Sequence, residues 1–484
     1  MQRCDTLIRE ASVLDGSGSA AELVDVGVRD GRIVAIGASL ECSSSTVIDG
    51  EGMVLAPGFI DVHTHDDISV IRNPTMLPKL SQGVTTVIVG NCGISAAPVE
   101  LSGELPEPMN LLGAPEDFCY PTFASYVAAI REAQPAVNVC ALVGHTSLRN
   151  NHMDRLDRAA TGAEVERMRV QLCEALAAGA LGLSSGVAYL SANAATTEEV
   201  AALAQPLASA GAVYTTHMRS EAEGILDAMQ EAFAIGRLSK VPVIVSHLKC
   251  AGVANWGRSE EVLHALDVAR GGQQIGCDCY PYAAASSTLD VRQVDERVKI
   301  TITWSTPHPE IAGQSLGEIA NSWNITHMDA ARRLQPAGAI YHSMSENDMR
   351  RILAHPATMI GSDGLPNDPR PHPRLWGTFP RVLGRYSREE GLISLPEAVH
   401  KMTEMPALRF GLAGRGTIRE GYCADLVLFD AEKIIDTATF SDPVCAAKGI
   451  RGVWVNGVLS YTKDGATGNH AGQFVARGKT EWIQ

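Results

Sequence analysis

The amino-acid sequence predicts an α/β fold, namely a (β/α)₈ TIM-type barrel with a small β-sandwich domain formed from both chain termini. Short apolar runs alternate with helical patterns through the middle of the chain, as the βα units of a parallel sheet do. Eight such runs fall within roughly 350 residues, enough for a barrel of about 250 residues that carries insertions. Both ends of the chain are rich in short β segments and turn residues instead, which predicts a separate sheet.

The two ends of the chain read as short strands separated by tight turns. Near the start, Asp15-Gly16 and Asp30-Gly31 are hairpin signals between β-like stretches. The stretches are residues 6–8, 11–14, 24–28 and 32–36 at the start, and 424–429 and 453–458 near the end. Because chain termini often lie close together, we expect residues 1–56 plus 415–484 to form one small β-sandwich domain.

The middle of the chain, residues 57–414, is expected to form the barrel. Its helical patterns cover residues 163–178, 197–210 and 221–235. The strand-like runs are residues 54–63, 85–91, 138–145, 180–185, 212–217, 242–247, 274–279 and 359–363. A long gap before the last run predicts an insertion at about residues 283–357.

Composition and charge limit the classes of protein to which the chain can belong. Of its 484 residues, 45% are apolar and 20% are charged, as in a soluble globular enzyme, and no window approaches the ~18 apolar residues of a membrane span. The start lacks an export signal, and the 11 scattered cysteines fit reduced thiols, so a cytoplasmic location is expected. A net charge of −15 argues against a nucleic-acid partner but allows a small anionic substrate in a local basic pocket.

Residues that can bind metal or move protons fall where the strand-like runs end, which is where a barrel of this kind carries its catalytic groups. The first run ends in His63-Thr64-His65, whose alternation puts both imidazoles on one face. Other runs end at or next to Cys92, His217, His247 and Asp363. Taken alone, Cys92 fits a small buried hydrophobe and Asp363 fits a helix cap. Together these imidazole, thiolate and carboxylate groups indicate a zinc site.

A resemblance to a known family rests on one long motif and several short ones. The long motif, Pro57-Gly58-Phe59-Ile60-Asp61-Val62-His63-Thr64-His65, resembles the signature of the amidohydrolase superfamily, whose small β-sandwich the chain ends also resemble. More narrowly, the chain resembles the N-acyl-D-amino-acid deacylases, also called D-aminoacylases. The motifs that carry this resemblance are Gly90-Asn91-Cys92-Gly93, Ser184-Ser185-Gly186, Ser246-His247-Leu248-Lys249 and residues 372–381.

The resemblance implies a set of metal ligands. Cys92, His217 and His247 would bind one tight zinc ion. A second, weaker metal position would be surrounded by His63, His65 and Asp363, with Cys92 able to bridge the two. Hydantoinases and dihydroorotases bridge two metals with a carbamylated lysine on a middle strand, but the third and fourth runs of this chain end without a lysine. Opening of cyclic amides, as in hydantoinases, is therefore the second enzymatic alternative.

The resemblance also implies hydrolysis of N-acyl-D-amino acids, and the residues suggest how. Zinc would polarise the acyl carbonyl, while Asp363 takes a proton from the attacking water and passes it to the leaving nitrogen. His63 or His65 would help to hold the water or the intermediate. The products would be a carboxylic acid and a free D-amino acid.

Candidate substrate-binding residues are basic or aromatic. Lys249 follows His247 by two residues and should share its face of the strand, where it could bind the α-carboxylate. Tyr189, Tyr282 and Arg374 are further candidates, although a structural ion pair is an equal explanation for Arg374. Arg292 begins the insertion, and its guanidinium suits a second carboxylate, although an exposed loop arginine is an equal explanation. We therefore expect N-acyl-D-glutamate to be preferred over N-acyl-D-aspartate and over hydrophobic substrates.

An alternative from another class is a non-enzymic, amidohydrolase-like assembly protein. Such proteins usually lose metal ligands, whereas every expected ligand position here holds a competent group. Zinc content and hydrolytic activity would distinguish the two alternatives.

Overall fold

The (β/α)₈ barrel predicted for the middle of the chain is confirmed by a computed structural model, which describes residues 2–101, 103–479 and 481–482. Its parallel strands follow one another as β6-β7-β8 and β9-β10-β11-β12-β13-β17. Their bounds are β6 (Phe59–Asp61), β7 (Val84–Val89), β8 (Asn138–Ala141), β9 (Val143–Gly144), β10 (Gly182–Gly186), β11 (Val213–His217), β12 (Val243–Val245), β13 (Ile275–Cys279) and β17 (Thr358–Ile360). A parallel bridge between Thr64 and Gly364 joins the last strand to the first, so the barrel closes.

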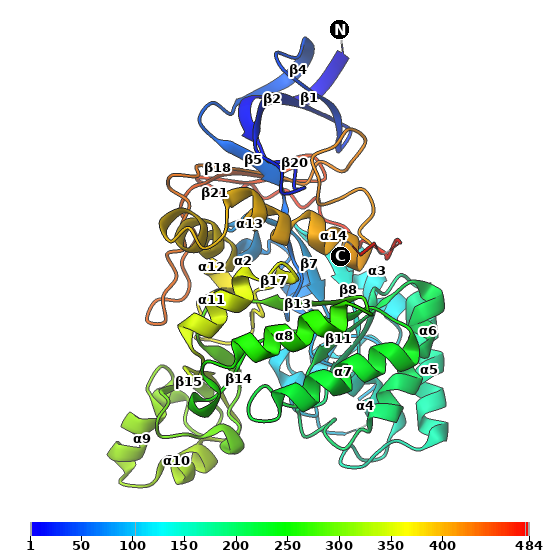
Figure 1. Cartoon of the computed structure of the whole chain (residues 1–484), viewed down its shortest axis with the longest axis vertical. Helices are drawn as coiled ribbons and strands as arrows, with labels where there is room; N and C mark the ends of the chain where they lie inside the picture. The colour runs from blue at the N-terminus through cyan, green and yellow to red at the C-terminus, as the bar shows by residue number, and fades with distance from the viewer. Residues whose placement is uncertain (1, 102, 480, 483–484) are drawn as a thin grey trace.

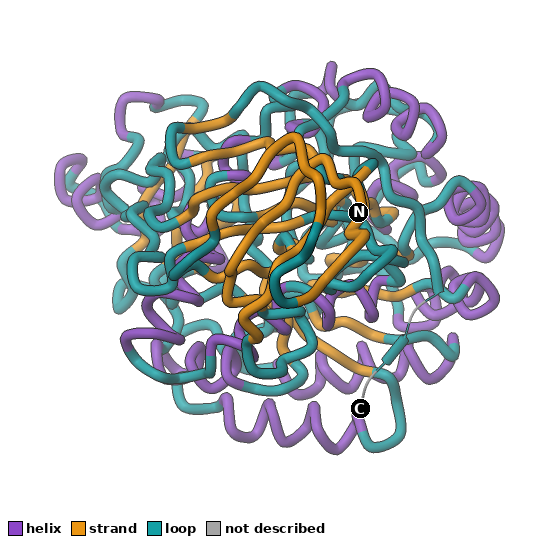
Figure 2. Tube along the Cα trace, turned by 90° about the horizontal axis from the view of Figure 1, so that it is seen from above, coloured by secondary structure: helices purple, strands orange, loops and turns teal. Residues whose placement is uncertain are grey.

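Helices surround the strands on the outside, as Figure 2 shows from above. The predicted helical patterns correspond to α5 (Gly162–Ala177), α6 (Thr197–Ala210) and α7 (Ile225–Ser239). Both α5 and α6 begin after a threonine, Thr161 or Thr196, whose side chain accepts a hydrogen bond from a backbone N–H of the first turn. Helix α7 begins four residues later than the pattern predicted, so Glu221 lies in the loop after β11 rather than in a helix.

The two ends of the chain form one nine-stranded sheet at the top of Figure 1, which confirms a small β domain built from both termini. Strands β5 and β18 pair antiparallel and thereby join the ends. The strands are β1 (Gln2–Val13), β2 (Glu22–Arg29), β3 (Arg32–Gly37), β4 (Cys42–Asp49), β5 (Val54–Pro57), β18 (Leu426–Phe429), β19 (Ile450–Val455), β20 (Val458–Thr462) and β21 (Gly465–Ala466). The core of this sheet includes Ile8, Val26, Leu55, Leu426 and Trp454.

Some predicted strand boundaries were wrong. The run at 54–63 is not one barrel strand, because its first half pairs in the terminal sheet as β5 and only Phe59–Asp61 enters the barrel. Gly58 lies at this switch, where an added Cβ would approach the side chain of Thr85 to 2.2 Å. The stretch at 453–458 is a hairpin, since Asn456 and Gly457 both have positive φ and turn β19 into β20.

The end of the chain leaves the terminal sheet and runs along the barrel. The backbone N–H of Val139 donates to the carbonyl of Gln473, and Val475 donates back to the carbonyl of Val139. Arg477 donates from Nε to the carbonyl of Ala210 at the end of α6. The predicted division into residues 1–56 plus 415–484 and residues 57–414 therefore stays a prediction, with the last residues in contact with both parts.

The predicted insertion forms a lobe of its own, seen at the lower left of Figure 1. It consists of the antiparallel strands β14 (Ala285–Thr288), β16 (Ala337–Tyr341) and β15 (Ile300–Ser305), with α9 (Leu316–Trp323) and α10 (His327–Leu334). Ile302, Ile319 and Leu334 belong to its separate hydrophobic core. The insertion is shorter than predicted, because α11 (Glu346–Ala354) packs against α8 (Ser259–Arg270) and β17 as a helix of the barrel.

Two further expectations concern membranes and thiols. Within the described residues, no helix has the length and apolar character needed to cross a bilayer. The cysteines, all of which lie in the described part of the chain, are free thiols, as predicted.

Candidate metal centre

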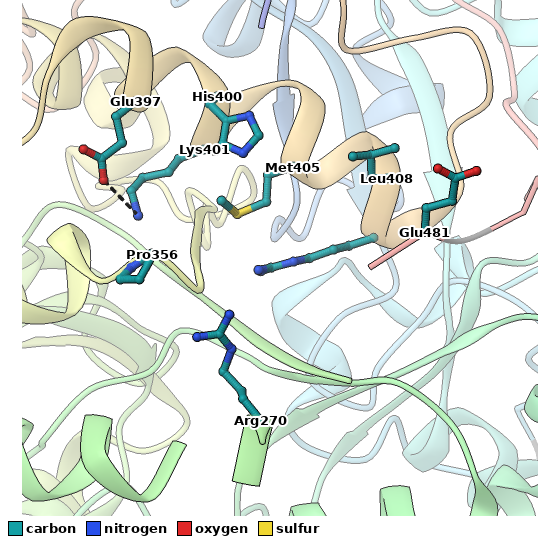
Figure 3. A pocket seen from close by; sticks show the side chains of 9 residues that line it. Arg270, Pro356, Glu397, His400, Lys401, Met405, Leu408 and Glu481 are labelled. Carbon is teal, nitrogen blue, oxygen red and sulfur yellow. Dashed lines mark ion pairs between the residues drawn. The ribbon is translucent and has the colours of Figure 1, made fainter. Parts of the chain in front are cut away.

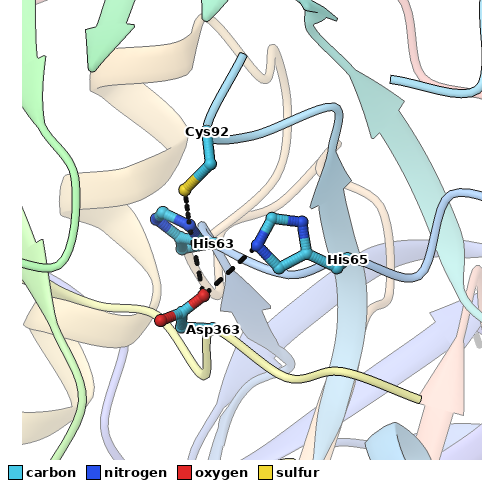
Figure 4. A group of neighbouring side chains, drawn as sticks. All are labelled: His63, His65, Cys92 and Asp363. Carbon is cyan, nitrogen blue, oxygen red and sulfur yellow. Dashed lines mark hydrogen bonds and ion pairs between the residues drawn. The ribbon is translucent and has the colours of Figure 1, made fainter. Parts of the chain in front are cut away.

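The carboxyl ends of five barrel strands bring together all of the residues predicted as metal ligands, along with the predicted catalytic aspartate; Figure 4 shows four of them, His63, His65, Cys92 and Asp363. His63 and His65 follow β6, Cys92 follows β7, His217 ends β11, His247 follows β12 and Asp363 follows β17. Their donor atoms form two groups, within each of which the atoms lie within 4.8 Å of one another. One group is His63, His65, Cys92 and Asp363, and the other is Cys92, His217 and His247. Cys92 belongs to both groups.

The distances within the two groups suit a small ion. Cys92 Sγ lies 3.2 Å from His63 Nε2 and 3.3 Å from His247 Nε2. Asp363 Oδ1 lies 3.3 Å from His65 Nε2 and 3.6 Å from His63 Nε2. An ion bound at about 2.0–2.3 Å from each donor in tetrahedral geometry separates its ligand atoms by roughly 3.5 Å. The donor sets are therefore spaced as a zinc ion requires.

The backbone of this site is strained at three of its functional residues. Cys92, His247 and Asp363 have φ values of 55°, 35° and 49°, in a region that non-glycine residues seldom occupy. Each such residue costs on the order of 1–3 kcal/mol, and such residues cluster at functional sites. Gly186, the last residue of β10, must be a glycine, because an added Cβ there would lie 2.1 Å from the carbonyl oxygen of Cys92.

The charges around Cys92 favour its thiolate form. Burial alone would raise the pKa of this thiol, but His63 and His247 beside it hold the pKa well below its usual range. Burial disfavours the charged form of His63, yet Cys92 and Asp278 raise its pKa well above the usual value. Because zinc binds the thiolate rather than the thiol, Cys92 is prepared for coordination.

Asp278 was not singled out in the sequence, yet it contacts two of the candidate ligands. Its Oδ1 lies 3.3 Å from His63 Nδ1 and accepts a 3.0 Å hydrogen bond from the backbone N–H of His247. Such a partner fixes which ring nitrogen of a histidine faces the metal. The feature that could have drawn attention to Asp278 was a carboxylate inside the apolar run that forms the buried strand β13.

We expect Asp278→Asn to weaken zinc binding about 10–100-fold, because the amide cannot orient the His63 ring as the carboxylate does. Competition with a chromophoric chelator would measure the change. Asp329→Asn, on the exposed helix α10, serves as the control and should retain wild-type affinity. Equal affinity in the two variants would show that Asp278 does not support the ligands.

A small cavity opens beside the metal ligands, and Lys249 lines it as predicted. Its Nζ lies 2.5 Å from Glu221 Oε1 and 2.8 Å from His247 Nδ1. Glu221 also lies 2.8 Å from His247 Nδ1, so one carboxylate contacts both the lysine and a ligand ring. Sequence reasoning missed Glu221 because it was expected within a helix.

The other predicted substrate-binding residues divide into two groups. Tyr189 lines the cavity with its hydroxyl 3.3 Å from His217 Nδ1. Arg374 is fully buried and does not itself line the cavity, which corrects the expectation from the sequence; its Nη1 lies 2.8 Å from Asp363 Oδ2. Tyr282 does not line the cavity, which is a correction to the expectation from the sequence. The N–H of Tyr282 donates to the carbonyl of Tyr280, so the chain turns tightly at Pro281 and Tyr280 takes the cavity position.

Arg292 lies at the mouth of the cavity with its side chain 51% exposed. Its Nη2 and Nε lie 2.6 and 2.9 Å from Asp290 Oδ2, so its charge is already paired. Arg292 and Asp290 also line a wider groove of about 850 Å³ that leads away from the cavity. His217 also lines this groove, so the groove brings Arg292 and one of the candidate metal ligands to the same opening.

Comparison of the whole chain with known proteins finds a matching family and several similar full-length proteins. The amidohydrolase family model matches residues 46–299 and 314–461 of the chain. A D-aminoacylase from Alcaligenes xylosoxydans xylosoxydans is 48% identical over 476 residues, which are 98% of this chain and 98% of that protein. From the same organism, an N-acyl-D-aspartate deacylase is 47% identical, covering 100% of this chain and 97% of its own. An N-acyl-D-glutamate deacylase from that organism is 45% identical, covering 95% and 94%.

Solved structures agree with the sequence comparison. A D-aminoacylase studied for its binuclear metal centre has a TM-score of 0.96 at 47% identity, covering 98% of this chain and 100% of that chain. An N-acyl-D-glutamate deacylase from Bordetella bronchiseptica has a TM-score of 0.95 at 44% identity, with the same coverage. That structure contains zinc and a phosphonate inhibitor that mimics the tetrahedral intermediate of the reaction.

Proposed function

The chain belongs to the amidohydrolase family, and on that basis we propose that it hydrolyses N-acyl-D-amino acids to a carboxylic acid and a free D-amino acid. The observation that carries the proposal is the pair of donor groups that share Cys92 beside a cavity lined by Asp363 and basic residues. The activities named for its full-length relatives support the same reaction.

The described ligands fit zinc. Imidazole nitrogens, one thiolate and one carboxylate are the donors that zinc prefers, and Cys92 is already held towards its thiolate form. We assign Cys92, His217 and His247 to one tight position, and His63, His65 and Asp363 to a weaker one. When bound, zinc would supply the Lewis acidity that polarises the acyl carbonyl and strengthens water as a nucleophile.

Asp363 is proposed as the residue that moves the proton. Burial would raise the pKa of this carboxyl, but Arg374 and the neighbouring histidines hold it well below its usual range, so the group is ionised and can accept a proton. Its Oδ2 is oriented by Arg374, which leaves Oδ1 directed at His63 and His65. The proton taken from water at this oxygen would then be delivered to the leaving nitrogen.

Lys249 and Arg374 are proposed to bind the α-carboxylate of the substrate. Both lie over the ring of Tyr280, with Lys249 Nζ at 5.8 Å and the Arg374 guanidinium carbon at 4.5 Å from its centroid. A carboxylate placed near this ring would therefore lie close to two cations. Tyr189, on the His217 side of the cavity, would limit where the substrate can lie.

Arg292 is proposed to favour an acidic side chain, with N-acyl-D-glutamate preferred and N-acyl-D-aspartate or a hydrophobic substrate as the alternatives. A guanidinium can bind a carboxylate through two parallel hydrogen bonds. The incoming carboxylate would have to share Arg292 with Asp290. A longer side chain reaches the mouth of the cavity more readily than a short one, which favours glutamate over aspartate.

Release of free amine from N-acetyl-D- and N-acetyl-L-glutamate, aspartate and leucine by the zinc-loaded protein tests the proposal. Turnover confined to D substrates, with glutamate fastest, is the expected result. Fastest turnover of D-leucine would keep the reaction and remove the acidic preference. No turnover of any of these, with ring opening of a hydantoin instead, would overturn the proposed reaction; no hydrolysis at all would favour an assembly role.

In the same assay, Arg292→Leu should lower kcat/KM for N-acetyl-D-glutamate about 10–100-fold, because a charge-assisted hydrogen bond to the substrate is lost. The activity on N-acetyl-D-leucine should not fall. Arg297→Leu is a matched control, since Arg297 pairs with Asp295 in the same way but does not line the cavity. Equal losses in the two variants would assign the effect to the groove as a whole.

A further inference from the structure

A second cavity lies at the end of the barrel opposite the metal centre (Figure 3). It has a volume of about 200 Å³ and is bordered by α8, α13 (Leu395–Met402) and α14 (Glu404–Phe410). Pro356, which lines it, precedes β17, whereas Asp363 follows the same strand. The cavity therefore shares a strand with the catalytic face but lies at the other end of it.

Three cations converge on this cavity from three helices. They are Arg270 at the end of α8, Lys401 on α13 and Arg409 on α14. Figure 3 shows Arg270 and Lys401 reaching towards each other from opposite sides. The side chain of Lys401 is fully buried, and that of Arg409 is nearly so. Long cationic side chains are seldom buried to this degree without a paired charge.

The partners of the two buried cations are mostly backbone carbonyls. Lys401 Nζ donates to the carbonyls of His355 and Thr358, and Arg409 Nη1 donates to that of Ala357 at 2.7 Å. These three carbonyls belong to the segment that leads into β17. The cations therefore hold the start of this strand, but carbonyls do not neutralise their charge.

Two carboxylates, Glu397 and Glu481, line the cavity against three cations among the described residues, so negative charge is in the minority there. Glu397 Oε1 lies 3.9 Å from Lys401 Nζ, the one ion pair drawn in Figure 3, and its side chain is 42% exposed. Arg409 makes no ion pair with any residue that the structure describes. Arg270 is paired with Asp267 one turn earlier on α8. Burial lowers the pKa of Lys401 to about 8 and that of Arg409 to about 10, because the half-exposed Glu397 offsets only part of the desolvation of Lys401 and Arg409 has no ion-pair partner among the described residues.

We propose that this cavity binds a small oxyanion, of the phosphate or carboxylate class, through Arg270, Lys401 and Arg409. Guanidinium groups present paired donors to such an ion, and the lysine adds a compact charge. The volume corresponds to about seven waters at ~30 Å³ each, so a phosphate or a small carboxylate fits with part of its hydration shell. The bound anion would relieve the repulsion among the cations and hold α8, α13 and α14 to the start of β17.

An anion that binds only the folded protein raises its melting temperature, and the rise grows with the logarithm of the anion concentration once this exceeds the dissociation constant. We expect inorganic phosphate to raise the Tm of the zinc-loaded protein above the effect of potassium chloride at equal ionic strength. Arg270→Gln should raise the dissociation constant for phosphate at least tenfold. Arg169→Gln is the matched control, because Arg169 also pairs with an acidic residue three positions earlier on a helix but lies away from the cavity.

Lys401→Met provides a second variant within the cavity, and sodium acetate replaces phosphate in a parallel titration. Loss of the phosphate effect in Arg270→Gln and Lys401→Met, but not in Arg169→Gln, supports the site. A rise in Tm with acetate that depends on the same residues supports the carboxylate class, and an effect of phosphate alone supports the phosphate class. A phosphate effect no larger than that of chloride, or one that survives equally in all variants, overturns the proposal. Hydrolysis without phosphate should be the same in Arg270→Gln and wild type.

Discussion

Replacing Asp363 by asparagine is expected to lower kcat for amide hydrolysis by about 10²–10⁴-fold, the range typical of losing a general acid–base group. The amide has nearly the same shape as the carboxylate but cannot take a proton from water at this position. The interaction with Arg374, now 2.8 Å from Oδ2, loses its charge as well. Steady-state rates with the preferred N-acetyl-D-amino acid measure the effect.

Two controls distinguish the role of Asp363 in proton transfer from its other roles. Zinc content should persist at the position formed by Cys92, His217 and His247, because Asp363 is not among those donors. In Arg374→Gln, Asp363 keeps its carboxylate but loses its guanidinium partner. If Arg374 binds the α-carboxylate of the substrate, this variant should raise KM more than it lowers kcat. A kcat for Asp363→Asn within tenfold of the wild type, with zinc bound, would assign the proton transfer to another group.

The sequence predicted the barrel and the clustering of the candidate metal ligands because both depend on local patterns. Apolar runs alternating with helical patterns indicate parallel strands, and in a barrel the carboxyl ends of such strands meet on one face. His217, at the end of β11, and His247, just past the end of β12, could therefore be placed together without knowing how the chain packs. Their shared neighbour Cys92 follows from the same reasoning.

The residues that support these ligands could not be found in this way. Glu221 and Asp278 act through contacts with His247 and His63, which are set by packing between different strands and loops. Tyr282 was named only as an aromatic candidate near the end of β13, but the backbone turns tightly after Tyr280, and Tyr280 lines the cavity instead. The sequence pattern does not reveal such a turn.

The chain also changes sheet within a run that looks continuous. Val54 to Asp61 is apolar enough for one strand, yet its two halves belong to the terminal sheet and to the barrel. Only a glycine at position 58 permits the close approach of Thr85 at the switch. In the sequence, this change of sheet is marked by a single residue, Gly58. The reason for the glycine is the side chain of Thr85, which is distant from it along the chain.

Lys79→Met is expected to lower the free energy of unfolding by about 3–5 kcal/mol, the cost typical of removing one partner from a buried ion pair. Lys79 Nζ is fully buried, 2.7 Å from Asp61 Oδ2 and 3.1 Å from Asp66 Oδ2. It also donates to the hydroxyl of Ser362 at 3.0 Å, so it joins the segments that carry the two histidines of β6 and Asp363. Methionine fills a similar volume but leaves two buried carboxylates without a cation.

Urea unfolding at constant zinc concentration would measure this loss. Lys433→Met is the matched control, because Lys433 pairs with Asp430 at a similar distance of 2.6 Å but is 76% exposed, and exposed pairs contribute at most about 1 kcal/mol. Adding Asp61→Asn to Lys79→Met should recover part of the stability, since one uncompensated charge is then removed. If the buried and exposed variants lost the same small amount, the lysine would be dispensable, and the β6 histidines would have to be positioned by the strand ends and Asp278 alone.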